Sequence, residues 1–488
     1  MIFEAFRRMR EERPHEAAFL ISAGDRAVPI TWRQFTDEIA AVAWLIDEHV
    51  PGATIGLLGE NSYEWMVVHA ACLFSGACVT PIDTNLTPTE VAERLRFTET
   101  RVLVYSSLYE EKAHEVARLC PGVGTGAFGS RKTDEFLERA HRAVVASGHS
   151  IWDAPPRYAD TSMLVFTSGT TSRPRGAELT VEGLEVFCRW AMECLPMKPG
   201  DRSLMLLPLH HIFGICVAYL LLTCGVALGV CPDFRRIYDA FVRFRVNYAF
   251  LVPALAEILA QKIQQKGDSA EAALGQPIDW IVSGGAALPR RTYEHLTSLG
   301  VKTITAYGLT ETTASYSLTP YVGDPHVGAQ GHVAMVPGVE TRVSADGELL
   351  IRGPCVMRGY YREPERTAAA IDKDGWYHTG DLGSIDKDGY VWITGRASRT
   401  IILSSGKKIA PEELEAKLLA LPGLREAVVS GEGETRDIKA EVYSAISEKS
   451  TLKAIGELNQ TLPVYKRIRT VVVRKEPFPR TSSGKIKV

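Results

Sequence analysis

LVFTSGTTSRPRGAELT, residues 164–180, places an apolar run directly before a segment rich in hydroxyl side chains, with two glycines and two arginines. The apolar run predicts the end of a buried strand, and residues 167–176 predict a polar loop. Such a loop can donate hydrogen bonds to phosphate oxygens, and Arg173 and Arg175 can add charge-assisted bonds. The alternative interpretation is an ordinary surface turn. The stretch is not a Walker P-loop, which requires Gly-Lys-Ser/Thr at the start of a helix.

Short apolar runs recur on both sides of this loop and alternate with amphipathic stretches such as TPTEVAERLRF. The runs are ATIGLLG (53–59), CVTPI (78–82), RVLVYS (101–106), NYAFLV (247–252) and DWIVSGG (279–285). Each run can be a strand buried on both faces, with the amphipathic stretches as crossover helices. The sequence therefore predicts an α/β fold with a large N-terminal domain of mainly parallel sheets flanked by helices.

The pattern changes from about residue 330. GELLIRGP, YVWITGR and TIILSS read as short strands separated by turn residues, which predicts a small β-barrel-like subdomain. A smaller unit follows, in which PEELEAKLLAL and TLKAIGELNQTL read as helices among further strands. We therefore predict two domains, a large one over 1–395 and a small α+β C-terminal one over 396–488.

Composition narrows the function classes. The 488 residues carry a net charge of -3 and no evident basic stripe, which argues against nucleic-acid binding. The nine cysteines form no C-x-x-C pair and the N-terminus lacks the apolar core of a signal peptide, so a cytoplasmic location is expected. Residues 203–232 lack Asp, Glu, Lys and Arg and are long enough to span a bilayer. Interrupting Pro, His and Gly residues instead favour a strand end, a loop, a buried helix and a strand, with no transmembrane segment.

Five separated motifs carry a family resemblance. They are TSGTTSRPRG (167–176), YGLTET (307–312), YHTGD (377–381), Gly-Arg at 395–396, and PRTSSGK (479–485). Together and in this order they resemble the adenylate-forming superfamily of AMP-forming acyl-CoA synthetases and acyl-adenylate ligases, over nearly the whole chain. The pattern is closest to fatty-acyl-CoA synthetases. The resemblance implies that a carboxylic acid and ATP give acyl-AMP and pyrophosphate, and that a thiol then takes the acyl group.

The resemblance also implies roles for residues that bind ATP and AMP. These are Thr167, Ser168, Gly169, Thr170, Thr171 and Gly176 for the outer phosphates; Gly284, Gly285, Ala286, Tyr307 and Gly308 for adenine; and Asp381 and Arg396 for ribose. Tyr307 would stack on the base, and small residues suit a flat ring at close range. The alternatives are a tight strand-to-helix turn at SGGAALP and a structural ion pair between Asp381 and Arg396.

Catalytic roles come from the same resemblance. Thr310 would contact phosphate and Glu311 would help to hold Mg²⁺, which stabilises the dense charge of the transition state. Lys485 would bridge the acid and the α-phosphate, and His211 would gate the acyl site. The structural alternatives are a solvated turn for Glu311, a solvated tail for Lys485 and a core histidine for His211.

The small domain is expected to be mobile. The resemblance implies that the small domain rotates about a hinge at Ser398. In one position it brings Lys485 to the active site, and in the other it brings the loop around Gly406, where a narrow pantetheine arm would enter. Gly406 can equally serve a turn. Two departures from the family pattern are visible: Ser172 and Arg175 stand in the phosphate loop, and Ser398 stands where Asp or Lys is usual.

The acid is expected to be apolar. The stretch LPLHHIFGICVAYL has no carboxylate to pair with a substrate ammonium, which argues against an amino acid. Ile212, Phe213 and residues near Ser283 would form the acyl pocket. In the family that the sequence resembles, fatty-acyl-AMP ligases that load carrier proteins usually carry an insertion between the motifs of the large and small domains. None is visible from Gly347 to Arg396, which favours coenzyme A as the acceptor.

The sequence thus predicts an ATP-dependent, AMP-forming carboxylate–CoA ligase for a fatty or other apolar acid. One alternative is an acyl- or aryl-AMP ligase that loads the phosphopantetheine thiol of a carrier protein. Another is a non-catalytic nucleotide-binding regulator, against which the retention of Lys485, Glu311 and Asp381 argues.

Overall fold

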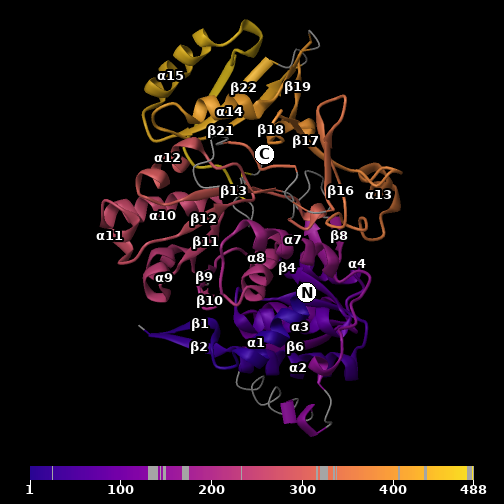
Figure 1. Cartoon of the computed structure of the whole chain (residues 1–488). Coiled ribbons are helices and arrows are strands. Elements are labelled where there is room, and N and C mark those ends of the chain that lie inside the picture. The colour runs from indigo at the N-terminus through magenta and orange to yellow at the C-terminus, as the bar shows by residue number, and fades with distance from the viewer. Residues whose placement is uncertain are drawn as a thin grey trace.

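The computed structural model describes the chain apart from residues 25, 130–140, 143, 147–149, 168–174, 232, 315–316, 319–327, 334–335, 337, 405–406, 434–436, 481–485 and 487–488. Figure 1 shows the large domain built from layered sheets and helices, with the small C-terminal domain at one end. The predicted α/β class and the mainly parallel sheets are confirmed.

The first sheet has six strands in the order β6-β5-β3-β4-β7-β8. Its strands are β3 (Thr54–Leu58), β4 (Cys78–Ile82), β5 (Val102–Ser106), β6 (Gly124–Phe128), β7 (Met163–Thr167) and β8 (Arg175–Leu179). All neighbours are parallel except β7 and β8, which pair antiparallel. The associated helices are α1 (Ile2–Glu12), α2 (Trp32–His49), α3 (Tyr63–Ser75), α4 (Pro88–Phe97), α5 (Glu110–Leu119) and α7 (Val181–Cys194). The predicted strands at 53–59, 78–82 and 101–106 are therefore confirmed.

Two further sheets complete the α/β part. One runs in the order β2-β1-β10-β9, from β1 (Ala17–Ala23), β2 (Arg26–Thr31), β9 (Arg202–Met205) and β10 (Ala227–Val230). The other runs β11-β12-β13-β14, from β11 (Tyr248–Leu251), β12 (Trp280–Ser283), β13 (Thr303–Tyr307) and β14 (Ser317–Leu318). Their helices are α8 (Ile212–Thr223), α9 (Ile237–Phe244), α10 (Pro253–Lys266), α11 (Ala270–Leu274) and α12 (Arg290–Ser298).

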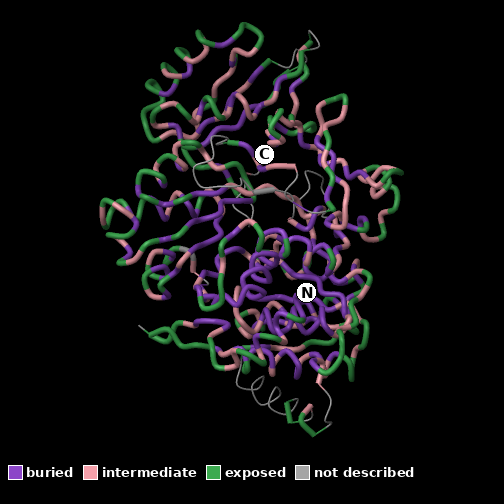
Figure 2. Tube along the Cα trace, viewed as in Figure 1, coloured by how far each residue is buried: buried purple, intermediate pink, exposed green. Residues whose placement is uncertain are grey.

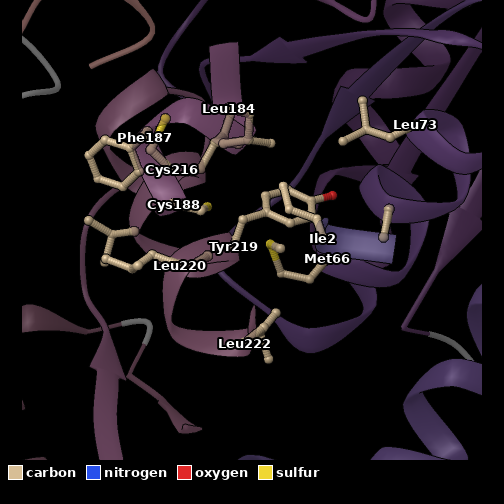
Figure 3. Close-up of a cluster of buried hydrophobic side chains, with 14 of the residues drawn as sticks. Ile2, Met66, Leu73, Leu184, Phe187, Cys188, Cys216, Tyr219, Leu220 and Leu222 are labelled. Atoms are coloured by element: carbon tan, nitrogen blue, oxygen red, sulfur yellow. The ribbon is translucent and has the colours of Figure 1, made fainter. Parts of the chain in front are cut away.

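The apolar stretch 203–232 folds as predicted, into β9, a loop, the buried helix α8 and β10. Every residue of α8 is buried except Phe213. Figure 3 shows Cys216 and Tyr219 of α8 among Leu184 and Cys188 of α7 and Met66 of α3. A helix that is apolar all round is buried in this way because no face of it suits water. Among the described residues, no helix combines the length and apolarity that crossing a membrane requires.

The predicted β-rich subdomain is an antiparallel sheet in the order β15-β16-β17-β18. It comprises β15 (Glu340–Val343), β16 (Glu348–Arg352), β17 (Tyr377–Ile385) and β18 (Val391–Arg396), with α13 (Pro364–Ala370) between β16 and β17. A 3₁₀ turn, η5 (Ala397–Arg399), leads out of β18. This sheet faces the α/β layers on one side of Figure 1 and leads into the small domain.

The small domain has a hydrophobic core of its own, centred on buried Leu414, Leu418, Val442 and Ile455. Its elements are β19 (Ile401–Ile402), β20 (Lys408–Ile409), α14 (Pro411–Leu419), β21 (Leu424–Glu432), β22 (Asp437–Ser444), α15 (Glu448–Thr461) and β23 (Thr470–Arg474). In Figure 2 the buried residues of the large domain gather most densely in its α/β part. Arg291 of α12 reaches across to this unit, where its Nη1 donates to the carbonyl of Leu424 at 3.0 Å.

Candidate active site

A cavity of about 620 Å³ lies where the α/β layers, the β-rich subdomain and the start of the small domain meet. It opens beyond the carboxyl ends of the parallel strands β11, β12 and β13, the usual place for ligands in such sheets. The site residues predicted from the sequence that line it are Thr167, His211, Ile212, Phe213, Gly285, Tyr307, Gly308, Thr310, Glu311, Arg396 and Ser398. These residues are up to 231 positions apart in the chain (Thr167 to Ser398), and the fold brings them to one space.

The phosphate-loop stretch is anchored at both ends. In the antiparallel pair β7–β8, Phe166 faces Gly176 and Thr167 faces Arg175, so the ends of the loop are held together. Thr167 and Arg175 line the cavity, and the Arg175 guanidinium lies 5.5 Å from the centre of the Tyr360 ring. Ser168, Gly169, Thr170, Thr171, Ser172 and Arg173 lie outside the described residues.

Thr310 and Glu311 begin a short 3₁₀ turn, η4 (Thr310–Thr312), directly after β13. The turn closes tightly, because a Cβ placed on Gly308 would lie only 2.2 Å from the carbonyl oxygen of Ala314. Ala314 itself has a positive φ of 53°, a conformation that non-glycine residues rarely adopt. This tight turn directs Thr310 and Glu311 to the cavity.

Tyr360 positions the Glu311 carboxylate. Its hydroxyl donates to Glu311 Oε1 at 2.9 Å. Burial and the charge of Glu311 raise the pKa of Tyr360 to about 12, so the phenol keeps the proton that it donates. Sequence reasoning missed this residue, although GYYRE at 359–363 lies within GELLIRGPCVMRGYYREPERTAAAID (347–372), a stretch that resembles fatty-acyl-CoA synthetases.

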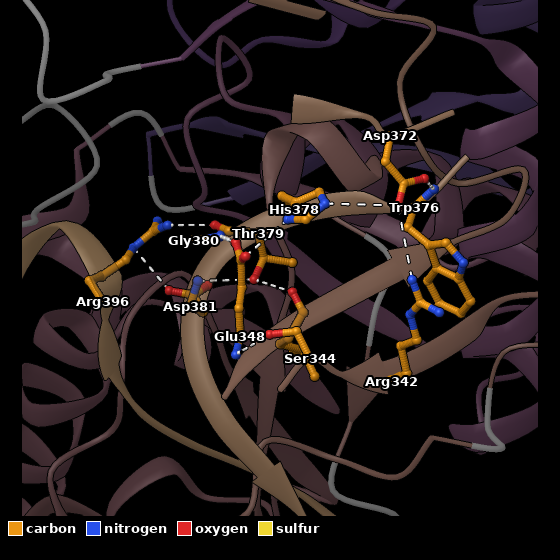
Figure 4. Close-up of polar contacts among 11 residues, drawn as sticks. Arg342, Ser344, Glu348, Asp372, Trp376, His378, Thr379, Gly380, Asp381 and Arg396 are labelled. Atoms are coloured by element: carbon orange, nitrogen blue, oxygen red, sulfur yellow. Dashed lines mark hydrogen bonds and ion pairs between the residues drawn. The ribbon is translucent and has the colours of Figure 1, made fainter. Parts of the chain in front are cut away.

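Asp381 is buried and held by two side chains that line the cavity. Its Oδ2 accepts from the Tyr307 hydroxyl at 2.5 Å, and its Oδ1 lies 3.0 Å from Arg396 Nε. Arg396 Nη1 also donates to the Thr379 carbonyl at 2.9 Å. Figure 4 shows the pairing of Asp381 with Arg396 across neighbouring strands. The ion pair weighed as a structural alternative is present, and it lies at the edge of the candidate nucleotide site.

Glu348 supports the turn that precedes Asp381. Its Oε1 accepts from the backbone N–H of Gly380 at 2.8 Å, and its Oε2 lies 3.0 Å from His378 Nδ1. Glu348 and His378 both line the cavity. Neither was singled out from the sequence, where Glu348 reads as an ordinary strand residue of GELLIRGP.

His211 precedes the first residue of α8 and lines the cavity with Ile212 and Phe213. Its neighbour His210 packs against it with ring centres 4.4 Å apart, and His210 Nε2 lies 3.6 Å from Asp83 Oδ1. Burial lowers the pKa of His210, which keeps that ring neutral near pH 7. Of the two histidines, only His211 faces the cavity.

Five predicted residues that the structure describes do not line the cavity, namely Gly176, Ser283, Gly284, Ala286 and the buried Asp381. Ser283 is buried on β12, where side chains alternate between the two faces of the sheet. Its strand neighbours Trp280 and Val282 belong to the core around α8, whereas Ile281 belongs to the core around α10. Ser283 and Ile281 are two positions apart on the strand, so their side chains point to the same face of the sheet. Ser283 therefore faces α10 rather than the acyl side on which the sequence placed it.

The hinge segment is tied to the small domain. Ser398 lies in η5, and Ser398 and Arg399 both line the cavity. Arg399 Nη1 donates to Glu412 Oε1 at 3.0 Å, and its Nη2 donates to Glu415 Oε1 at 2.5 Å, both on α14. Sequence reasoning missed Arg399, since a charged residue beside a turn carries no special signal.

Lys485 and Gly406 lie outside the described residues. The chain beside Lys485 is attached to the small domain, because Ile486 bridges to Arg480 and Arg480 pairs with Glu426 of β21. Within the described part of the chain, no three His, Cys, Asp or Glu side chains gather as a metal-binding group. Among the described residues, the carboxylate side chains that line the cavity are Glu311 and Glu348.

Comparisons with known proteins agree with this geometry. Residues 6–361 match the family model described as AMP-binding enzyme, and residues 398–487 match the AMP-binding enzyme C-terminal domain. The long-chain-fatty-acid–CoA ligase FadD15 of Mycobacterium bovis is 28% identical over 434 residues, covering 78% of this chain and 72% of that protein. The 4-coumarate–CoA ligase 2 of Oryza sativa is 29% identical over 476 residues, covering 89% and 82%. The ATP-bound MatB structure from Rhodopseudomonas palustris is 26% identical, with a TM-score of 0.85 over 100% of this chain and 97% of that one.

Proposed function

This chain belongs to the AMP-binding enzyme family and is an AMP-forming ligase of the acyl-CoA synthetase type, and on that premise we propose that it joins an apolar carboxylic acid without an α-amino group to coenzyme A. One observation carries the proposal: a single cavity gathers the ends of a hydroxyl-rich loop, a carboxylate held by a tyrosine, a buried aspartate–arginine pair and an apolar wall. Each of these suits a different part of the reactants.

The phosphates of ATP lie at the end of the cavity formed by Thr167, Arg175 and Thr310. Guanidinium, hydroxyl and backbone N–H groups there stabilise charge that spreads over phosphate oxygens in the transition state. Glu311 fits a role in holding Mg²⁺, which in nucleotide sites is bound by one or two carboxylates together with substrate phosphates. When bound, that ion neutralises phosphate charge.

The nucleoside of AMP lies toward Tyr307 and the pair of Asp381 with Arg396. A buried carboxylate can accept hydrogen bonds from both ribose hydroxyls, which replace the hydrogen bond that Tyr307 now donates. Tyr307 is then released to lie against the base. The small residue Gly285 beside it lets a flat ring approach the backbone.

The acid enters along the wall of Leu207, Ile212, Phe213 and Val252, with His211 at its inner end. Its carboxylate attacks the α-phosphorus of ATP; a P–O bond forms to the acid and the bond to pyrophosphate breaks. Lys485, carried by the small domain, contributes charge and position to this step rather than acting as a base.

The two half-reactions use two positions of residues 396–488. Rotation about Ser398 withdraws Lys485 and presents the segment around Gly406, where the thiol of coenzyme A reaches the acyl-AMP. The thiolate attacks the acyl carbon and AMP leaves. Arg399, tied to Glu412 and Glu415, moves with the small domain as one unit.

The test is pyrophosphate release from ATP with fatty, aryl and amino acids, each with and without coenzyme A. We expect release with apolar acids, thioester formation only when coenzyme A is present, and no release with amino acids. Lys485→Ala is expected to lose adenylation by orders of magnitude while remaining folded.

Other outcomes assign the chain differently. Thioester on a carrier protein but not on coenzyme A would make it a carrier-loading ligase. Nucleotide binding without pyrophosphate release from any acid would make it a regulator. Near-full activity of Lys485→Ala would remove that lysine from the mechanism.

A further inference from the structure

Phe213 stands apart from the rest of its helix. It is the one residue of α8 that is not buried, and its side chain lines the cavity. The other residues of α8 pack into the core on all sides. A phenyl ring at this point, in the first turn after His211, bounds the end of the cavity where the acid is proposed to lie.

The ring closes on two very small neighbours. A Cβ placed on Gly284 would lie 2.8 Å from Phe213 Cζ, 3.0 Å from its Cε1 and 3.3 Å from the Cβ of Ala306. The edge of the ring therefore rests on the bare backbone of Gly284, beside the methyl group of Ala306. Any side chain at 284 would displace the ring, so the ring packs tightly on the glycine at the wall of the cavity.

The sheet face beneath this contact is filled. Gly284 directly follows β12, and the ring of Trp280, at the start of that strand, stacks on Tyr248 of β11 with centres 4.2 Å apart. Phe250 meets Trp280 edge-on at 5.7 Å. All three aromatic residues are buried. An acyl chain could not continue along this face without displacing one of them.

Helix α8 cannot withdraw to make room. A Cβ on Gly214 would lie 2.3 Å from the Pro208 carbonyl oxygen, so the first turn of the helix sits directly on the preceding loop. The space beyond Gly214, lined by Leu207, Val217 and Ala218, amounts to about 10 Å³. A space of that size holds about one water molecule and no methylene chain.

From these contacts we infer that Phe213 is a specificity-determining residue that closes the acyl end of the cavity over Gly284, so that the acid is compact, a short acyl chain or a single aromatic ring. The inference rests on the proposed function, since it concerns the acid of that reaction. A long-chain fatty acid is excluded by the ring, not by charge.

The experiment measures kcat/KM for pyrophosphate release with butanoate, benzoate, octanoate and hexadecanoate. The unmodified protein is expected to favour butanoate and benzoate over hexadecanoate. Phe213→Ala is expected to raise the octanoate-to-butanoate ratio of kcat/KM by at least about tenfold. The reason is that a hydrophobic pocket discriminates between substrates that differ by one methylene group by about 10- to 200-fold in kcat/KM. Phe213→Leu, which keeps an apolar side chain on α8, is expected to give an intermediate ratio and guards against misfolding of the alanine variant.

Phe97→Ala serves as the matched control, because Phe97 is also half-buried but does not line the cavity. Its acid preference is expected to equal that of the unmodified protein. Preference for hexadecanoate by the unmodified protein, or an unchanged ratio in both Phe213 variants, would overturn the inference and leave the ligase function standing. Absence of pyrophosphate release with every acid would instead overturn the proposed function, and the inference with it.

Discussion

Replacing Tyr360 with phenylalanine tests whether Glu311 works from a fixed position. The substitution removes one hydroxyl and leaves the ring, which is buried and lies beside Arg175. The lost hydrogen bond, 2.9 Å to Glu311 Oε1, has a charged acceptor. Such bonds contribute about 1.5–3 kcal/mol. Since each 1.36 kcal/mol is about tenfold in rate, kcat/KM for ATP should fall by about 10- to 150-fold if that energy acts in the transition state.

The assay is the initial rate of pyrophosphate release at saturating acid, with ATP varied. Tyr361→Phe is the matched control, because the neighbouring tyrosine does not line the cavity and should change the rate little. In a Glu311→Gln background, Tyr360→Phe should cost little more, because both residues act through the same carboxylate. A Tyr360→Phe enzyme within about threefold of the unmodified rate, or a loss shared equally by Tyr361→Phe, would refute the assigned role.

Two further predictions concern stability. His69 is buried, and its Nδ1 lies 2.9 Å from the Tyr219 hydroxyl oxygen. Burial lowers the pKa of His69 to about 3, whereas in the unfolded chain a histidine has a pKa near 6.5. The contribution of neutral His69 to the free energy of unfolding is therefore complete above about pH 6.5. It is lost as the pH falls toward 3, by up to about 1.4 kcal/mol per pH unit. The melting temperature of His69→Gln should therefore fall less steeply than that of the unmodified protein between about pH 7.5 and 5.5, and an equally steep fall would contradict this. Arg399→Ala leaves Glu412 and the mostly buried Glu415 without the arginine that pairs with them. For a partly exposed ion-pair cluster, this should lower the stability of the small domain by about 1–3 kcal/mol. Amide hydrogen exchange should then become faster in α14 and β21 but not in the large domain, and unchanged exchange would show that the cluster is not needed to stabilise the small domain.

The pattern of apolar runs was enough to predict the α/β class and the mainly parallel sheets. The stretch 203–232 shows why: charge-free length alone allows a membrane span, but interrupting Pro, His and Gly residues divide it into a strand, a buried helix and a strand, as found. Residues at motif positions, such as Thr310 and Arg396, were located by resemblance and lie at the cavity. Local sequence carries these signals because each depends on neighbours within one element.

Contacts between distant elements could not be predicted in the same way. The bond from Tyr360 to Glu311 joins residues 49 positions apart, and the contact of Phe213 with Gly284 joins helix α8 to the segment that follows β12. Neither pairing leaves a periodic trace in the sequence. The placement of Ser283 in the acyl pocket differs from the structure for a related reason. The sequence predicted the strand, but not which of its alternating side chains point to which face of the sheet.

The fate of the carboxylate oxygen tests the central claim most directly. With a substrate acid labelled with ¹⁸O in its carboxyl group, attack on the α-phosphorus of ATP followed by thiol attack must leave one labelled oxygen in AMP. Mass spectrometry of the products of the complete reaction is predicted to find that label in AMP and none in pyrophosphate. Unlabelled AMP, or label in inorganic phosphate, would contradict the proposal that the acid attacks the α-phosphate in this cavity.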